Sequence, residues 1–190
     1  MRSGDASCND AIAALLRAEL DSPTESARLR AALVQLHVDE HLVAEPDVGN
    51  SRENSTRWAV FGAYRGRETL FETLDMRALQ WRWELFGELE LRTRVVTCRH
   101  HSEREFATRD PGRIADVLNS NARPNGVLDR LRNGEVLEPP LLVSLPRCER
   151  LVILEGHNPV LSYLRDVSVP VFPISVLVGV SDEVSRWREW

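Results

Sequence analysis

One stretch of the sequence decides the fold: Leu151-Val152-Ile153-Leu154-Glu155-Gly156-His157-Asn158-Pro159. It opens with a short apolar run of the kind found in buried strands, and it closes with Asn158-Pro159, which is typical of the start of a helix. A single glycine lies near the middle. The stretch therefore predicts a buried strand that turns directly into a helix at Gly156.

Such a junction can bind an anion, because the first amides of a helix have no partner within it and point along the helix dipole. Gly156 lacks a side chain and would let a phosphate approach, while Glu155 and His157 add a carboxylate and an imidazole. We expect the amides of Gly156, His157 and Asn158 to hold phosphate. Glu155 would act as a base or metal ligand, and His157 would assist proton transfer or hold phosphate. The alternative is a tight structural turn whose histidine only caps or packs.

Regions on both sides extend this alternation of strands and helices. Residues 141–145 predict a second buried strand, residues 158–165 the helix, and residues 169–178 a strand interrupted by two prolines. Upstream, residues 125–131 predict a short helix that Asn133-Gly134 ends. The pattern predicts an α/β domain.

The front of the chain has a helical pattern. Residues 10–20 predict one helix, and Ser22-Pro23-Thr24-Glu25 has the form of a capping box that starts a second. Turn formers at 45–51 suggest a linker. We therefore divide the chain into a helical N-terminal extension, 1–50, and an α/β domain, 51–190.

The region after the linker is rich in aromatic and β-branched residues. Residues 58–64 and 69–71 flank Arg65-Gly66-Arg67, which predicts a β-hairpin. The aromatic stretch 81–91 fits helix and strand equally, and residues 92–98 predict a strand.

At the other end, Ser181 can cap a terminal helix that reaches Trp190. Val184, Trp187 and Trp190 are spaced one turn apart, so their stripe seals either the core or a homodimer interface. Glu138 is an isolated acid that we expect on the solvated surface.

Composition narrows the function classes. The chain has 190 residues, 43% of them hydrophobic, and a net charge of −5, so it can bury a core but does not favour nucleic acid as a partner. All 24 basic residues are arginine. A Walker-type phosphate loop and any lysine nucleophile or Schiff base are therefore excluded.

Location can be predicted from the same counts. No apolar run approaches the roughly 18 residues that a membrane span needs, and the first residues lack the order of a secretory signal. The three cysteines have neither disulfide nor zinc spacing. We expect a cytoplasmic protein without membrane contact.

The sequence from Gly134 to Val143, with Pro139-Pro140 before its apolar run, and then residues 151–157 resemble the ParB/sulfiredoxin-like domain. In that domain a Pro-Pro-strand element precedes a second strand that ends in an acid-Gly-His turn. The resemblance covers about 125–180 well and the region from Trp58 loosely. It implies a mixed sheet with flanking helices, here with a helical N-terminal extension, and nucleotide bound at the helix start. Members include nucleotide-gated DNA clamps, sulfinic acid reductases, free-serine kinases and nucleases.

Glu155, Gly156 and His157 match the family's acid-Gly-His turn, but Pro159 stands where the family usually has an arginine that grips phosphate. Losing that clamp removes about 1.5 to 3 kcal/mol of binding unless another arginine compensates. Arg165, Arg147, Arg150 or a further arginine would have to supply that contact, and of these we expect Arg165 to bind the nucleotide.

The resemblance and the residues together predict a nucleotide-dependent phosphotransferase or hydrolase that acts on a small molecule and uses ATP, ADP or CTP with magnesium. His157 occupies the place of the reductase cysteine, and the DNA clamps carry a downstream helix-turn-helix that we do not expect here. The alternative is a non-catalytic member that senses a ligand or binds a partner protein. A third reading is a metal-dependent nuclease, which the net charge does not favour.

Overall fold

A computed structural model describes residues 3–22, 25–44, 51–65, 74–96, 123–165 and 172–187 of the chain. Its strands form one sheet in the order β1-β2-β6-β4-β5-β3. The strands are β1 (Gly4–Asp5), β2 (Gln80–Phe86), β3 (Val95–Val96), β4 (Leu141–Ser144), β5 (Leu151–Glu155) and β6 (Ile174–Val180). The sheet is mixed, because β4–β6 and β3–β5 are parallel and the remaining pairs are antiparallel.

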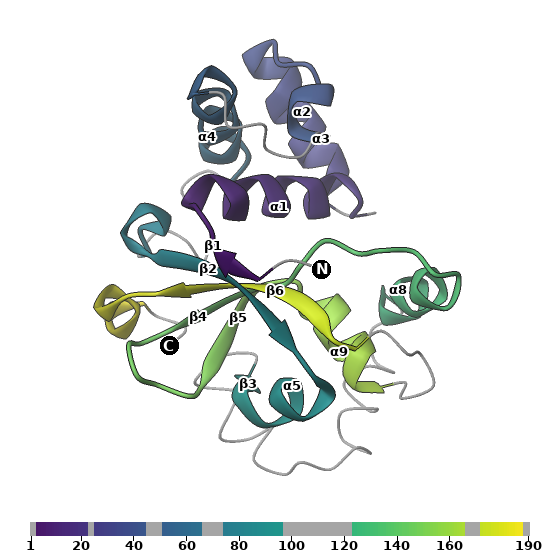
Figure 1. The fold of residues 1–190 in the computed structure, drawn as a ribbon. Coiled ribbons are helices and arrows are strands. Elements are labelled where there is room, and N and C mark those ends of the chain that lie inside the picture. The colour runs from purple at the N-terminus through teal and green to yellow at the C-terminus, as the bar shows by residue number, and fades with distance from the viewer. Residues whose placement is uncertain are drawn as a thin grey trace.

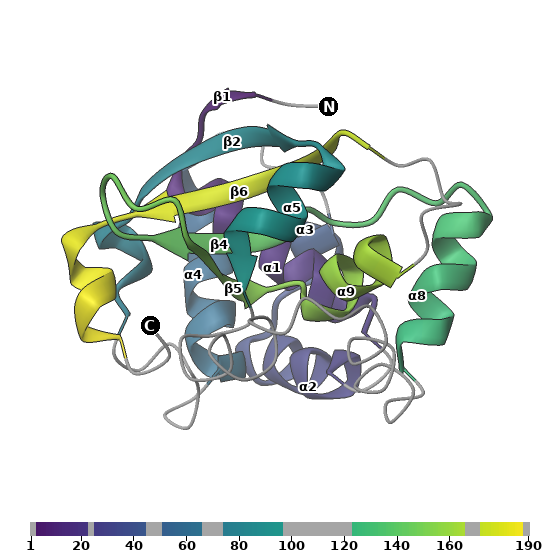
Figure 2. The same ribbon diagram turned by 90° about the horizontal axis from the view of Figure 1, so that it is seen from below.

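Helices lie on both faces of this sheet (Figure 1). One face carries the N-terminal helices α1 (Cys8–Leu20), α2 (Ser26–Leu36), α3 (His41–Ala44) and α4 (Ser51–Arg65). The other carries α5 (Glu88–Arg94) and α9 (His157–Arg165), with α8 (Arg123–Arg132) beside α9 (Figure 2). Two 3₁₀ helices, Met76–Ala78 and Asp182–Arg186, flank β2 and β6. The expected α/β architecture with a helical N-terminal region is confirmed.

The alternation of side chains along the strands divides the apolar core in two. In β5, Val152 and Leu154 join the core beneath the N-terminal helices, whereas Leu151 and Ile153 join the core beneath α5 and α9. All four residues are buried, as expected for a short apolar run covered on both faces.

The expectation of a β-hairpin from residue 58 is wrong, because residues 51–65 form helix α4. Its buried side chains are Arg57, Val60, Phe61 and Tyr64, which is helical spacing, while Gly62 is exposed. Aromatic and β-branched content suggested a strand, but the periodicity of burial is that of a helix. The second half of the expected hairpin, 69–71, lies outside the described residues.

The ambiguous aromatic stretch divides at Gly87 into strand β2 and helix α5. The Gly87 amide donates to the Glu90 carboxylate at 2.8 Å, which caps the first turn of α5. Helix α5 continues through Arg94, so the strand expected over 92–98 is reduced in the described part to Val95–Val96.

The predicted caps are partly confirmed. The Ser22 hydroxyl accepts the Glu25 amide at 3.3 Å, but the Glu25 carboxylate accepts the Tyr64 hydroxyl at 3.0 Å instead of completing the capping box. Ser181 accepts the Glu183 amide at 3.2 Å and starts a short 3₁₀ helix.

The C-terminal stripe belongs to the core for the two members that are described. Val184 and Trp187 are both buried against the core under the N-terminal helices, and Trp190 lies outside the described residues. Within the described parts of the chain, no helix has the length and apolar character of a membrane span.

Candidate functional site

The predicted junction is formed at the C-terminal end of β5. The strand ends at Glu155, helix α9 begins at His157, and Gly156 between them has φ +91°. A side chain would be strained at this φ, so the turn requires glycine. The first bond of α9 runs from the Val160 amide to the Gly156 carbonyl at 3.0 Å.

Pro140 forms a wall against this glycine. A Cβ built on Gly156 would lie 2.9 Å from the Pro140 Cα and 3.1 Å from its Cβ. Pro140 is itself fixed, because its carbonyl accepts the Leu177 amide at 3.0 Å. The expected reason for the glycine is thereby corrected: Pro140 takes the space that the missing side chain leaves, so a phosphate would have to approach from the amide side of the turn.

Glu155 and His157 flank Gly156 and are both half-buried. By the alternation of β5, Glu155 belongs with Leu151 and Ile153 on the face that α9 covers. The carboxylate therefore lies on the same side of the sheet as the helix whose first turn His157 opens. These two groups and the turn between them form the candidate site.

The other predicted site residues lie in α9. Asn158 contributes its backbone to the first turn, and Arg165 is the last residue of the helix. The side chains of both lie outside the described atoms. A helix of this length extends about 12 Å, so α9 does not bring the backbone of Arg165 to the turn.

Arg147 and Arg150 are no closer, because both precede β5 and lie in the loop at its other end. A strand of five residues extends about 16 Å. The structure therefore does not bring either arginine of this loop to Gly156, where the resemblance led us to expect a compensating arginine.

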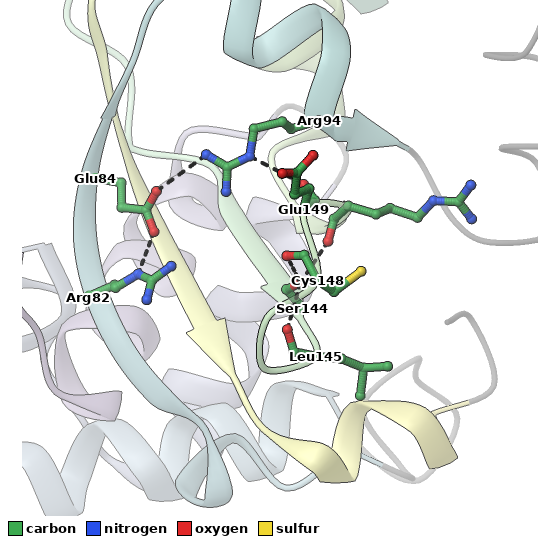
Figure 3. A network of polar contacts seen from close by, with 8 residues as sticks. Arg82, Glu84, Arg94, Ser144, Leu145, Cys148 and Glu149 are labelled. Carbon is green, nitrogen blue, oxygen red and sulfur yellow. Dashed lines mark hydrogen bonds and ion pairs between the residues drawn. The ribbon is translucent and has the colours of Figure 1, made fainter.

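The loop between β4 and β5 is closed by its own hydrogen bonds (Figure 3). The hydroxyl of Ser144, which is buried, lies 2.7 Å from the Arg150 carbonyl and 3.2 Å from each of the Leu145 and Cys148 carbonyls. The Cys148 amide donates to the Leu145 carbonyl at 3.2 Å, and Arg147 has φ +61°. This end of β5 is held by contacts inside the protein.

The side chain of Arg94 connects the same loop to strand β2 (Figure 3). The Arg94 Nε donates to the Glu149 carbonyl at 3.2 Å, and its Nη1 lies 3.8 Å from the Glu84 carboxylate. Glu84 also pairs with Arg82, and the Arg94 guanidinium lies 5.0 Å from the centre of the Phe86 ring. Each of these two arginines therefore lies against the Glu84 carboxylate.

Sequence reasoning missed the ion pair of Arg17 with Glu138, which lies two residues before Pro140 in the chain. Glu138, expected as a solvated acid, accepts two hydrogen bonds from Arg17 of α1, Nε to Oε1 and Nη2 to Oε2, both at 2.9 Å. The side chains are only 19% and 25% exposed. The partners are 121 residues apart in sequence. No local pattern could have revealed the pair, although Pro139-Pro140 marked the segment.

Metal binding was expected at Glu155 alone. In the described ranges, no group of three His, Cys, Asp or Glu side chains is placed to hold a metal ion. One carboxylate together with nucleotide phosphates is a set of ligands that Mg²⁺ accepts, since this ion usually keeps several waters. Glu155 therefore fits a magnesium ion that arrives with a nucleotide.

Fold and turn together define a mixed α/β protein with a strand-glycine-helix junction. Comparison of the chain with protein-family models, with curated proteins and with solved structures finds no match.

Proposed function

We propose that the Gly156 turn binds the phosphates of a nucleotide, and that the protein is a ParB/sulfiredoxin-like phosphotransferase or hydrolase that acts on a small molecule. One observation supports this most: a glycine at φ +91° joins β5 to α9 between a carboxylate and an imidazole. The first amides of α9 then face the ligand with the positive end of the helix dipole.

Each residue of the turn has a role in this proposal. The amides of Gly156, His157 and Asn158 bind phosphate oxygens. Glu155 takes the proton of the attacking hydroxyl or water, or holds the magnesium ion of the nucleotide, and His157 donates a hydrogen bond to phosphate. Because Pro140 covers one side of Gly156, the nucleotide enters from the side of the α9 amides.

A second candidate is a member that binds nucleotide without turnover. Pro159 is compatible with the first turn of a helix, so the amides keep their direction, but no phosphate-gripping arginine is present at that position. The positions of Arg165, Arg147 and Arg150 favour this candidate, since neither α9 nor β5 brings them to the turn.

Thermal unfolding with ATP, ADP and CTP, each with and without magnesium, tests binding. A ligand at a hundredfold its Kd stabilises the folded state by about 2.7 kcal/mol. If none of the three nucleotides raises the unfolding temperature, both candidate functions are excluded.

Substitution of Glu155 separates the two candidates. Under the phosphotransfer proposal, Glu155→Gln abolishes turnover and keeps nucleotide binding, while Glu149→Gln, an exposed acid at the other end of β5, leaves both unchanged. Turnover that survives in Glu155→Gln would assign the chemistry to another residue. Binding without turnover in the unmodified protein would favour the second candidate. Pro159→Arg should raise nucleotide affinity if the alignment with the family is right.

A further inference from the structure

We propose that Arg17 and Glu138 are positioning residues for the Gly156 turn, through which helix α1 sets the place of Pro140. The ligand part of this inference rests on the proposed function, whereas the positioning part does not. The segment 133–140 connects α8 to β4 and passes the end of α1 (Figure 1).

Two arginine contacts attach this segment to the last turn of α1. Arg17 binds the Glu138 carboxylate with two hydrogen bonds of 2.9 Å. Arg130 bridges Asp21, the C-cap of α1, at 3.0 Å and Glu135 at 2.7 Å. The segment is therefore held near both of its ends by the same end of one helix.

The Glu138 contact lies two residues before Pro140. Pro140 is then fixed on two sides, by the Leu177 amide at its carbonyl and by the close approach of Gly156. Arg17 is thus linked to the turn by its ion pair with Glu138, by the two residues of main chain from Glu138 to Pro140, and by the approach of Pro140 to Gly156.

The turn needs such a wall because a glycine has no side chain to select its own conformation. Gly156 can adopt many φ values, so its surroundings must hold it at +91°. If Pro140 moves away, Gly156 can relax and the first amides of α9 change direction. The bidentate hydrogen bonds between the Arg17 guanidinium and the Glu138 carboxylate fix the relative orientation of the two groups as well as their distance. A single charge contact would fix only the distance.

Native-state amide exchange tests the positioning in Arg17→Gln, in Glu138→Gln and in the double variant. The informative amides are Leu177, which donates to Pro140, and Val160, which donates to Gly156. Ser181, which donates to Ser144 at the far end of the β4–β6 pair, is the internal reference. We expect exchange at Leu177 and Val160 to be about fivefold faster and unchanged at Ser181.

Two further variants separate positioning from general stability. The double variant should exchange no faster than either single one, and the swapped pair Arg17→Glu with Glu138→Arg should restore part of the protection. Arg30→Gln breaks a more exposed pair, Arg30 with Glu40, on the same helical layer and should change neither amide. Unchanged exchange at Leu177 and Val160, or an equal rise at Ser181, would overturn the proposal.

Nucleotide titration tests the ligand part. If a nucleotide stabilises the unmodified protein, Arg17→Gln should raise its Kd about fivefold and Arg30→Gln should not, and an unchanged Kd in Arg17→Gln would overturn this part. If no nucleotide stabilises the unmodified protein, the proposed function fails. The exchange rates at Leu177 and Val160 then still decide whether Arg17 and Glu138 position the turn.

Discussion

Strand β5 has two different ends. At its N-terminal end, the loop from β4 folds back on the hydroxyl of Ser144 and on the guanidinium of Arg94. At its C-terminal end, Gly156 turns the chain into α9. Each end contains one residue with a positive φ, Arg147 at +61° and Gly156 at +91°. A positive φ therefore does not by itself indicate a turn that could bind an anion. Arg147 lies in a loop whose carbonyls bond to the Ser144 hydroxyl, whereas Gly156 directly precedes a helix.

The largest expected effect comes from Gly156→Ala. The new methyl group would meet the main chain of Pro140 in addition to the strained φ, so we expect a loss of about 3 kcal/mol of unfolding free energy in denaturant titration. Gly62→Ala in the exposed face of α4 is the control, because nothing lies within 4 Å of its Cβ. The control should gain about 0.5 to 1 kcal/mol. Equal effects at both positions would contradict the role of Pro140.

Alkaline pH tests how firmly α9 packs after the turn. Burial raises the pKa of Tyr163 to about 12, from 10.0 for an exposed tyrosine. Well below pH 10 the Tyr163 phenol is neutral in the folded and in the unfolded protein. Between pH 10 and 12 it ionises in the unfolded chain but stays neutral in the folded one. The free energy of unfolding therefore falls as the pH rises toward 12. Tyr163→Phe should remove about 2 to 3 kcal/mol of that fall. Parallel stability curves for the two proteins from pH 9 to 12 would show that burial does not raise the pKa of Tyr163.

The closed end of β5 depends on Ser144. Ser144→Ala removes the hydroxyl that faces the Arg150, Leu145 and Cys148 carbonyls, and we expect a loss of about 1 to 2 kcal/mol. Ser185→Ala removes an exposed hydroxyl that donates to the Asp182 carbonyl and should change stability by less than about 0.5 kcal/mol. Thermal and urea unfolding both measure the difference. A loss no larger than that of Ser185→Ala would mean that the hydroxyl does not hold the loop.

The smallest effect is expected at Arg147. Arg147→Gly relieves a positive φ but adds freedom to the unfolded chain, so the net change should be a gain of at most about 0.5 kcal/mol. In urea unfolding, Arg147→Gly should raise the free energy of unfolding slightly, whereas Gly156→Ala should lower it. A clear loss in Arg147→Gly would show that the arginine side chain itself stabilises the loop.

The elements around β5 could be predicted because each was bounded by local signals. Short apolar runs gave β4 and β5, and Gly134 ends α8 with φ +78° and an amide bonded to the Leu131 carbonyl, as a helix-ending glycine should. Helix α4 was missed because aromatic content outweighed the spacing of its buried residues.

The contacts that complete the candidate site could not be predicted in the same way. Pro140 against Gly156 and Arg17 with Glu138 both depend on how distant segments pack, and a one-dimensional pattern does not contain that information. The sequence could suggest the acid-Gly-His turn as an anion site, but not the wall behind it.

The order of the strands has a consequence for the emerging chain. Strand β6 lies between β2 and β4, and its register pairs Val180 with Gln80. The middle of the sheet is therefore supplied by the last of the described strands in chain order. Until then, the core that α1 joins lacks Leu177. Pairing so remote in sequence is slow to close. A fragment that stops before residue 174 should therefore not retain the sheet, because β2 and β4 have no direct pairing without β6.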